Sequence, residues 1–249
     1  MRRTLIALSA ATAFLASPAL AGGLGTMTDD ERAAFHAEVR QYLIDNPGVI
    51  MEAMQVLQDR QDKTAADQDQ MILSQNRDSL FNDPDSWVGG NPDGDITLVE
   101  FMDYRCSYCR KANQEVTDLV RNDGNIRYVV KEFPILGEDS IASSRFAIAM
   151  RILHGDDAYA AVHEELITLR GAPDPQTLTR IAEKMGFAAQ PLLDMMGTDR
   201  VTSIIAANHA LADKLKISGT PTFIVDSILL RGYLPQEEME RIVAEARAG

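Results

Sequence analysis

The sequence predicts an α/β fold in which a helical N-terminal segment precedes a mixed sheet interrupted by a long helical insertion. Two observations support this. Apolar runs at residues 96–102 and 126–133 flank a segment with helical periodicity, and β-rich runs return at 222–225 and 228–230 after a long helical stretch. A pair of cysteines at the first strand-to-helix junction is a candidate reactive site.

The first residues have the pattern of a secretory signal peptide. Arg2 and Arg3 precede an apolar run at 5–15, and Ala19 and Ala21 form a small-x-small cleavage pattern. The run is too short and too often interrupted by polar residues for a membrane anchor. We therefore expect residues 1–21 to be removed and the mature protein to be periplasmic or otherwise exported.

Residues 28–46 are predicted to form a helix. Thr28 is a suitable N-cap with Glu31 three residues later, which is a capping box. Asn46-Pro47 ends the helix and a second one begins at Pro47. The apolar stripes of the two helices are Phe35, Val39, Tyr42 and Leu43, followed by Ile50, Met54 and Leu57.

The segment 22–57 is too small to hold a core by itself, so its apolar stripe must pack on the rest of the chain or on other copies. Residues 58–70 are almost entirely polar, which is typical of a solvated helix or a flexible linker. We therefore predict a helical oligomerisation segment at 22–57, a polar helical linker at 58–80 and a catalytic domain at 81–249.

The catalytic domain begins with a turn-rich stretch at 89–95, followed by a buried strand at 96–102. A helix at 106–120 then leads to a second strand at 126–133. This strand–helix–strand unit predicts a parallel pair of strands.

Residues of about 138–216 have helical periodicity, with helices ending near Gly155, Gly171 and Gly186. The strands at 222–225 and 228–230 then form a hairpin about Asp226-Ser227, and a terminal helix starts at Pro235.

The chain's two cysteines, Cys106 and Cys109, lie at the predicted start of a helix. Backbone N–H groups and the helix dipole at this position stabilise an anion, which lowers the pKa of the first thiol. Cys106 is then the attacking nucleophile, and Cys109, one turn later, resolves the mixed disulfide.

Other uses of the cysteine pair are less well supported. A structural disulfide closing so short a loop stabilises little, and covalent haem attachment needs histidine where Arg110 stands. Zinc needs more ligands than the pair supplies. Copper(I) bound by the two thiolates remains a real alternative, because soft ligands select it. The histidines are scattered without metal-ligand spacing: His36, His154, His163 and His209.

The formal net charge of −13 argues against nucleic acid or anionic lipid as a partner. No cofactor is required for thiol chemistry. The expected partners are exported proteins with cysteines and a membrane or soluble redox partner.

A second motif, Gly219-Thr220-Pro221, places a proline at the start of a strand. Together with Val99-Glu100-Phe101 before the Cys-x-x-Cys motif and the helical insertion, it resembles the DsbA-like branch of the thioredoxin superfamily. The resemblance covers roughly residues 81–248. It implies a thioredoxin-like fold in which Pro221 is cis and faces the cysteines, and in which Thr220 and Pro221 position an extended substrate.

Glu100 should share a strand face with Leu98 and Met102, in a sheet covered by helices on both sides. The resemblance implies a carboxyl beneath the active site that exchanges protons with the resolving cysteine, and we assign this catalytic role to Glu100. Lys131 is either its partner or, as we favour, a surface lysine.

Residues 27–75 more weakly resemble the oligomerisation region of the ScsC group, the suppressors of copper sensitivity, through the segments at 42–47 and 50–54. This implies a homo-oligomer, with a trimer favoured. Ser107 and Tyr108, which we expect to contact substrate, differ from the Pro-His dipeptide of DsbA oxidases and argue against a strongly oxidising potential. We therefore predict a disulfide isomerase or reductase, with a dithiol oxidase or a copper(I)-delivery protein as alternatives.

Overall fold

The computed structural model describes residues 27–248, which divide into two compact units at Arg60. The predicted signal peptide and its cleavage after Ala21 lie outside the described residues. Across the described part of the chain, every helix is either too short or too polar to span a bilayer.

The first unit contains helix α1 (Asp29–Asp45) and the beginning of α2 (Gly48–Gln75). The predicted capping box is confirmed: Glu31 N–H donates to the Thr28 hydroxyl, and Thr28 N–H donates to the Glu31 carboxylate at 2.8 Å. No residue of α1 is buried, and Met51 of α2 is 67% exposed. The apolar stripe of this unit is therefore not covered within the unit itself.

The second unit is built on a five-stranded sheet of order β1-β3-β2-β4-β5. The central strands β2 and β3 are parallel, as predicted from 96–102 and 126–133, and every other neighbouring pair is antiparallel. The strands are β1 (Trp87–Gly90), β2 (Ile96–Met102), β3 (Ile126–Glu132), β4 (Thr222–Val225) and β5 (Ile228–Arg231).

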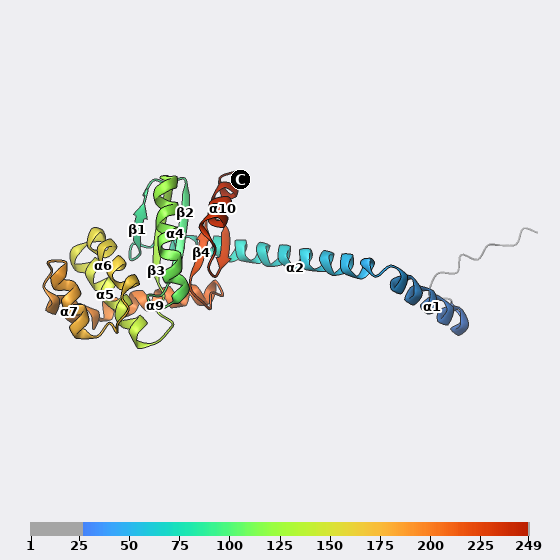
Figure 1. The fold of residues 1–249 in the computed structure, drawn as a ribbon, viewed down its shortest axis with the longest axis horizontal. Helices are drawn as coiled ribbons and strands as arrows, with labels where there is room; N and C mark the ends of the chain where they lie inside the picture. Colours follow the sequence, from blue (N-terminus) through green and yellow to red (C-terminus); the bar gives the residue numbers. More distant parts are fainter. Residues whose placement is uncertain (1–26, 249) are drawn as a thin grey trace, which may run out of the picture. The chain divides into compact units, whose positions relative to one another are not determined.

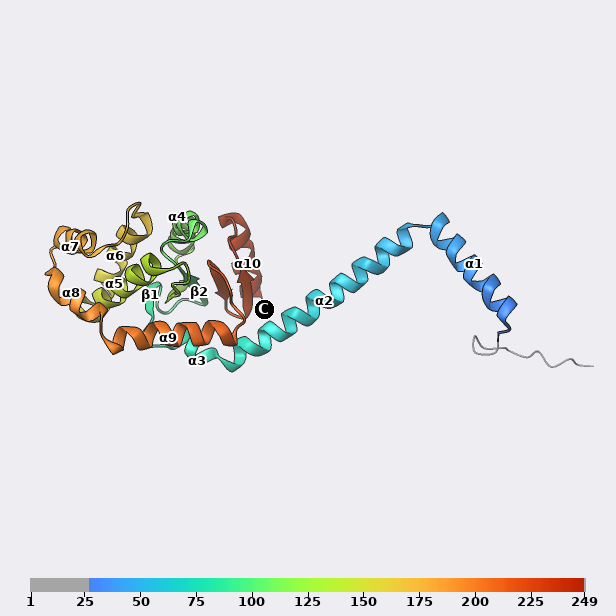
Figure 2. The same ribbon diagram turned by 90° about the horizontal axis from the view of Figure 1, so that it is seen from below.

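Helices cover both faces of the sheet, as the continuous apolar runs predict. Leu98 and Met102 pack on one face with α4 (Ser107–Asp123) and α10 (Gln236–Ala248). Val99 and Phe101 pack on the other face with α3 (Arg77–Phe81) and α9 (Asp199–Lys214). Figures 1 and 2 show these two layers.

The predicted helical insertion at about 138–216 is confirmed between β3 and β4. Apart from α9, which packs on the sheet face described above, its helices gather beside the β1 edge of the sheet, where α6 (Asp156–Thr168) contacts β1 (Figure 1). The sequence patterns did not single out α8, which is short. The insertion contains α5 (Glu138–His154), α6 (Asp156–Thr168), α7 (Pro175–Lys184), α8 (Ala189–Met196) and α9.

Strand β1 was not predicted, because its Gly89-Gly90 pair is typical of a turn. Gly90 does have a positive φ of 65°, and a Cβ atom there would lie 2.4 Å from the Ile126 carbonyl oxygen. Only glycine allows the backbone of this edge strand to approach β3 so closely.

The predicted linker at 58–80 is helical over most of its length and contributes to the core of the second unit. Leu73 at the end of α2 and Leu80 of α3 are buried with Phe101. The Arg231 guanidinium also binds the Asp69 carboxylate through two hydrogen bonds. The packing of the second unit therefore begins before residue 81.

Candidate active site

The cysteine pair lies at the start of α4, directly after the carboxyl end of β2, and Cys106 is the N-cap residue. The preceding loop is held by Asp103, whose buried carboxylate accepts hydrogen bonds from the N–H groups of Arg105, Ile135 and Leu136. Asp103 thus ties the loop that carries Cys106 to the segment after β3.

The Cys106 thiol is surrounded by groups that favour its ionised form. The Cys109 thiol donates a hydrogen bond to it, and the N–H groups of Cys109 and Tyr108 are also directed at the sulfur. Its Sγ lies 3.2 Å from the Thr220 carbonyl oxygen. The hydrogen bond from the Cys109 thiol has the largest effect. Together with hydrogen bonding at Thr220 and from the backbone N–H groups, it outweighs partial burial and lowers the pKa of Cys106 to about 5.

Cys109 has the opposite environment. Its side chain is 1% exposed. The hydrogen bond to Cys106, burial and the nearby Glu100 carboxylate all raise the pKa of the Cys109 thiol above its usual value. At neutral pH the pair is therefore one thiolate at Cys106 and one shielded thiol at Cys109.

The loop before β4 lies against the cysteines. The Thr220–Pro221 peptide bond is cis, and the Thr220 carbonyl contacts Cys106 Sγ as described above. Thr220 is half-buried, whereas Ser107 and Tyr108 are exposed beside the cysteine pair. The four residues assigned to substrate contact in the sequence thus lie on or directly beside the cysteine motif.

Glu100 is buried beneath the cysteines and accepts a hydrogen bond from the Tyr128 hydroxyl. Desolvation raises the pKa of the Glu100 carboxyl to about 7, against the effect of the Tyr128 hydrogen bond, and charges at Cys106 and Glu132 act in the same direction as burial. A carboxyl with this pKa can accept or release a proton at neutral pH.

Both expectations for Lys131 are wrong. Lys131 pairs with Phe101 in the β2–β3 register, so it faces the opposite side of the sheet from Glu100. Its side chain is fully buried and its ammonium group donates to the Asp83 carboxylate at 2.6 Å and to the Ser79 carbonyl at 2.7 Å. Lys131 therefore ties β3 to the segment after α3 and has no contact with Glu100.

A second buried carboxyl, Glu132, was not predicted. It lies at the end of β3, and its two oxygens contact the hydroxyl groups of Tyr104, Tyr159 and Ser144 at 2.6–2.8 Å. Desolvation raises the pKa of Glu132 to about 7. Strand alternation was an available signal, because Tyr128, Val130 and Glu132 share one face of β3.

The described residues, 27–248, include no cluster of three or more His, Cys, Asp or Glu side chains that could hold a metal ion. Two thiols remain available for a soft ion.

A strand-to-helix Cys-x-x-Cys motif facing a cis-proline loop, on a mixed sheet covered by helices, defines a thioredoxin-like redox protein. The family model described as "Thioredoxin" matches residues 82–245, and the chain belongs to this family. A second model, "Copper resistance protein ScsC N-terminal domain", matches residues 31–63.

Three known proteins illustrate the similarity. A thioredoxin-like oxidoreductase from Silicibacter pomeroyi is 44% identical, with a TM-score of 0.65, over 70% of this chain and 99% of that one. ScsC from Proteus mirabilis is 25% identical, with a TM-score of 0.65, over 90% of this chain and 98% of that one. The Na⁺/H⁺ antiporter NhaA 1 of Salinispora arenicola is 30% identical over 67% of this chain, which spans about a quarter (26%) of that protein's length.

The thiol environment leads to a first prediction. Thiolate absorbance measured against pH should show one transition near pH 5, from Cys106. In Cys109→Ala the transition should move to higher pH, because the hydrogen bond from Cys109 has the largest effect on the Cys106 pKa. The Cys106→Ser protein is the control and should show no transition below pH 9. A wild-type transition at or above the free-cysteine value of about 8.5 would contradict the assignment of Cys106 as nucleophile.

Proposed function

We propose that this protein is a thiol–disulfide oxidoreductase that acts on exported proteins, with isomerisation or reduction as its main activity. The observation that carries the proposal is the difference between the two thiols: Cys106 caps a helix and has a pKa lowered to about 5, whereas the pKa of Cys109, which is 1% exposed, is raised. The family membership and the oxidoreductase from Silicibacter pomeroyi support it.

The proposed reaction proceeds in two exchanges. The Cys106 thiolate attacks a substrate disulfide, so that a Cys106–substrate disulfide forms and one substrate thiolate leaves. The Cys109 thiol then loses its proton to Glu100 and attacks Cys106 Sγ, which forms the Cys106–Cys109 disulfide and releases the second substrate thiolate. In isomerisation, the first substrate thiolate instead attacks another disulfide of the substrate and displaces a new thiolate. A substrate thiolate then attacks the mixed disulfide at the substrate sulfur, which forms the rearranged disulfide and releases the Cys106 thiolate.

Glu100 is the proposed proton acceptor for Cys109. The two groups interact electrostatically, and the negative charge of Glu100 opposes ionisation of the thiol. With a pKa near 7, Glu100 is ionised in part of the molecules and can take the proton. A low pKa at Cys106 also makes this sulfur a good leaving group, which suits repeated formation and release of mixed disulfides.

Thr220, Pro221, Ser107 and Tyr108 are the proposed substrate contacts. Thr220 contacts Cys106 through its carbonyl, and Tyr108, which is 58% exposed, packs its ring near Tyr233 at a centroid distance of 6.1 Å. Lys111 lies over the Tyr233 ring at 4.0 Å. An extended substrate placed beside Thr220 would meet this aromatic surface next to the thiolate.

The function is tested by turnover of scrambled ribonuclease and of insulin, with copper(I) titrated into the reduced protein in parallel. We expect the protein to reactivate scrambled ribonuclease in a redox buffer. Copper(I) should inhibit this activity only weakly, because it should compete poorly with the substrate for the two thiols. A tight copper(I) complex without catalysed exchange would favour the copper-delivery alternative, to which the ScsC-type N-terminal match draws attention. Fast oxidation of reduced ribonuclease without isomerisation would favour a dithiol oxidase.

The N-terminal segment is proposed to form a homo-oligomer, with a trimer favoured. The supporting observation is an apolar stripe on α2 that is exposed in one chain, including Ile50, Met54 and Leu57. Burying such side chains against copies of the same helix is favourable. Several thiolates around one stalk would then meet a misfolded substrate at high effective concentration.

Assembly gives a second prediction. Met54→Glu should reduce the mass measured by light scattering from that of an oligomer to that of one chain, because a charge in the shared apolar stripe is costly to bury. Gln68→Glu, which adds the same charge in the polar part of α2, is the matched control and should remain oligomeric. Isomerase activity should fall with the loss of assembly, whereas reduction of a small disulfide should not. A monomeric wild-type protein would disprove this proposal.

A further inference from the structure

Glu132 is the first member of a hydrogen-bonded chain that leads to the surface. The Tyr104 hydroxyl lies 2.8 Å from Glu132 Oε1 and 3.1 Å from His163 Nδ1. His163 Nε2 lies 3.1 Å from Asn113 Oδ1. The Asn113 amide Nδ2 in turn donates to the exposed Glu164 carboxylate at 3.3–3.4 Å.

The donors and acceptors allow this chain two proton arrangements. Because Asn113 turns its amide N–H₂ toward Glu164, its oxygen faces His163, so Nε2 must carry a proton. If the imidazole is neutral, Nδ1 accepts from Tyr104, and Glu132 must be protonated in order to donate to the Tyr104 oxygen. If Tyr104 donates to Glu132 instead, His163 must donate from Nδ1 and is an imidazolium.

The two arrangements contain the same number of protons and the same heavy-atom positions. They differ by the shift of one proton from Glu132 to Tyr104 and of the Tyr104 proton to His163 Nδ1. Burial lowers the pKa of His163 to about 4 and raises that of Glu132 to about 7, and both shifts favour the neutral arrangement over the one with an imidazolium.

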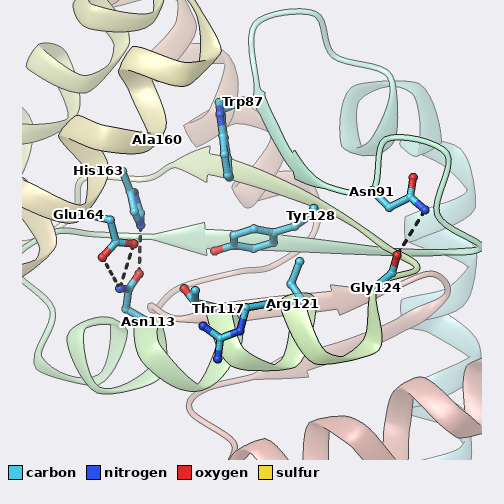
Figure 3. Close-up of a pocket in the computed structure, with 12 residues that line it drawn as sticks. Trp87, Asn91, Asn113, Thr117, Arg121, Gly124, Tyr128, Ala160, His163 and Glu164 are labelled. Atoms are coloured by element: carbon cyan, nitrogen blue, oxygen red, sulfur yellow. Dashed lines mark hydrogen bonds between the residues drawn. The ribbon is translucent and has the colours of Figure 1, made fainter.

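His163 lies on the wall of a cavity of about 470 Å³ between α4 and α6. Figure 3 shows His163 and Glu164 directed toward Asn113, with Tyr128 in the middle of the cavity wall and Trp87 above it. The cavity is large enough to hold water and is lined by several polar groups. When the Nε2–H···Oδ1 bond to Asn113 opens, an imidazolium can pass its Nε2 proton to water in this cavity.

Glu132 is also close to Glu100. In the parallel register Glu100 pairs with Val130 and Glu132 with Met102, so the two carboxyls are diagonal neighbours on one face of the sheet. The Glu132 charge raises the proton affinity of Glu100. The proton content of Glu132 is thus coupled to that of the proposed proton acceptor.

We propose that Tyr104 and His163 form a proton relay that connects the buried carboxyl Glu132 to the cavity between α4 and α6, and that the charge it leaves on Glu132 adjusts proton uptake by Glu100. The proposal rests on the thiol-exchange function given above. In the outward step the Glu132 O–H bond breaks, a Tyr104 O–H bond forms while the original hydroxyl proton moves to His163 Nδ1, and Nε2 releases its proton to water. Tyr104, His163 and Glu132 are positioning residues, because none of them contacts a reacting sulfur.

The groups that face the relay from each packed element are few. Glu132 is faced by Glu100 of β2, by Tyr104 and Asp103 before α4, by Ser144 of α5 and by Tyr159 of α6. The ring of His163 is faced by Tyr104 and Asn113, with the neighbouring Glu164 at the surface. Burial raises the pKa of Glu132 to about 7, so that part of the molecules keep the proton on this carboxyl at neutral pH.

The relay is tested on the second exchange, the closure of the Cys106–Cys109 disulfide from a preformed mixed disulfide. Trp87, the single tryptophan of the chain, stacks on Tyr159 and lies edge-on to Tyr128, so its fluorescence should report this step. In His163→Ala and Tyr104→Phe we expect closure to slow by about tenfold at neutral pH, less than for loss of a group that takes the proton itself. Added imidazole should restore the rate of His163→Ala, because the truncation enlarges the adjoining cavity.

The matched control is His154→Gln, in which a histidine stacked on Phe187 outside the relay is replaced. It should keep the wild-type pH profile and show no response to imidazole. Equal pH profiles for wild type, His163→Ala and Tyr104→Phe would overturn the relay. Failure of the function itself looks different, because the wild-type protein would then show no catalysed exchange at all.

A measurement on the unmodified protein keeps the proposal testable if a variant does not fold. Nitrogen-15 NMR of the imidazole should find His163 neutral at pH 6 to 8 with its proton on Nε2. A neutral ring with its proton on Nδ1 would mean that Nε2 has no proton to release to the cavity, and would disprove the relay.

Discussion

Cys106→Ser should abolish catalysed disulfide exchange, and Cys109→Ser should stop the reaction at the mixed disulfide. A serine hydroxyl is not ionised near neutral pH, so the attacking anion is lost. In Cys109→Ser the nucleophile remains and forms the bond to substrate, but no second thiol resolves it. We expect a loss of about 10³-fold or more in insulin reduction for Cys106→Ser, since removal of a covalent nucleophile costs at least this much. We expect a similar loss for Cys109→Ser, because its mixed disulfide is not resolved.

The two cysteine variants are separated by mass spectrometry after incubation with a peptide disulfide. Cys109→Ser should carry one peptide per chain in a reducible linkage, and Cys106→Ser should carry none. Ser203→Ala, at an exposed position on α9, is the control and should behave as wild type. If Cys109→Ser turned over insulin at the wild-type rate, Cys109 would have no resolving role and the protein would act through Cys106 alone.

The sequence was sufficient for those parts of the fold that depend on local pattern. The apolar run at 96–102 became β2 with identical bounds, and the Cys-x-x-Cys motif lies at the start of a helix as expected. Strand β1 was not predicted, because glycine is required at position 90 by the nearby backbone of Ile126, a residue far along the chain. Such close backbone contacts leave no local signal apart from glycine itself.

The buried polar groups show a similar limit. Glu100 was recognised because strand alternation and the family resemblance pointed to it. Glu132 also lies on the inward face of its strand by alternation. Its hydrogen bonds, however, come from Tyr104, Ser144 and Tyr159, which belong to three separate segments. Single sequence positions cannot show that three hydroxyl groups converge on one carboxyl.

The interpretation of Lys131 failed for a related reason. A lysine inside an apolar strand was expected to be solvated or to pair on the active-site face. The register places it on the other face, where Asp83 satisfies its charge. The acidic partner comes from the loop before β1, and no pattern in β3 indicates it.

Glu100→Gln should make the protein more stable at alkaline pH while slowing the second exchange. The pKa of Glu100 is raised from 4.5 to about 7 in the folded protein, so between these values the folded state holds a proton that the unfolded chain has lost. The stabilisation from the neutral, buried carboxyl is complete below pH 4.5 and is lost as pH rises through 7. Because Glu100 is 4% exposed, this shift corresponds to about 3 kcal/mol.

A glutamine at position 100 never ionises and keeps an oxygen to accept the Tyr128 hydroxyl hydrogen bond. Chemical denaturation at pH 8.5 should therefore give a free energy of unfolding up to about 3 kcal/mol above that of wild type, with no difference at pH 4. Closure of the Cys106–Cys109 disulfide should slow by about 10²-fold, as expected for loss of a positioned base. Glu183→Gln, an exposed position on α7, is the control and should change neither quantity. An equal loss of stability at both pH values would show that Glu100 supports the fold through its hydrogen bond and is not held as a neutral acid beneath the thiols.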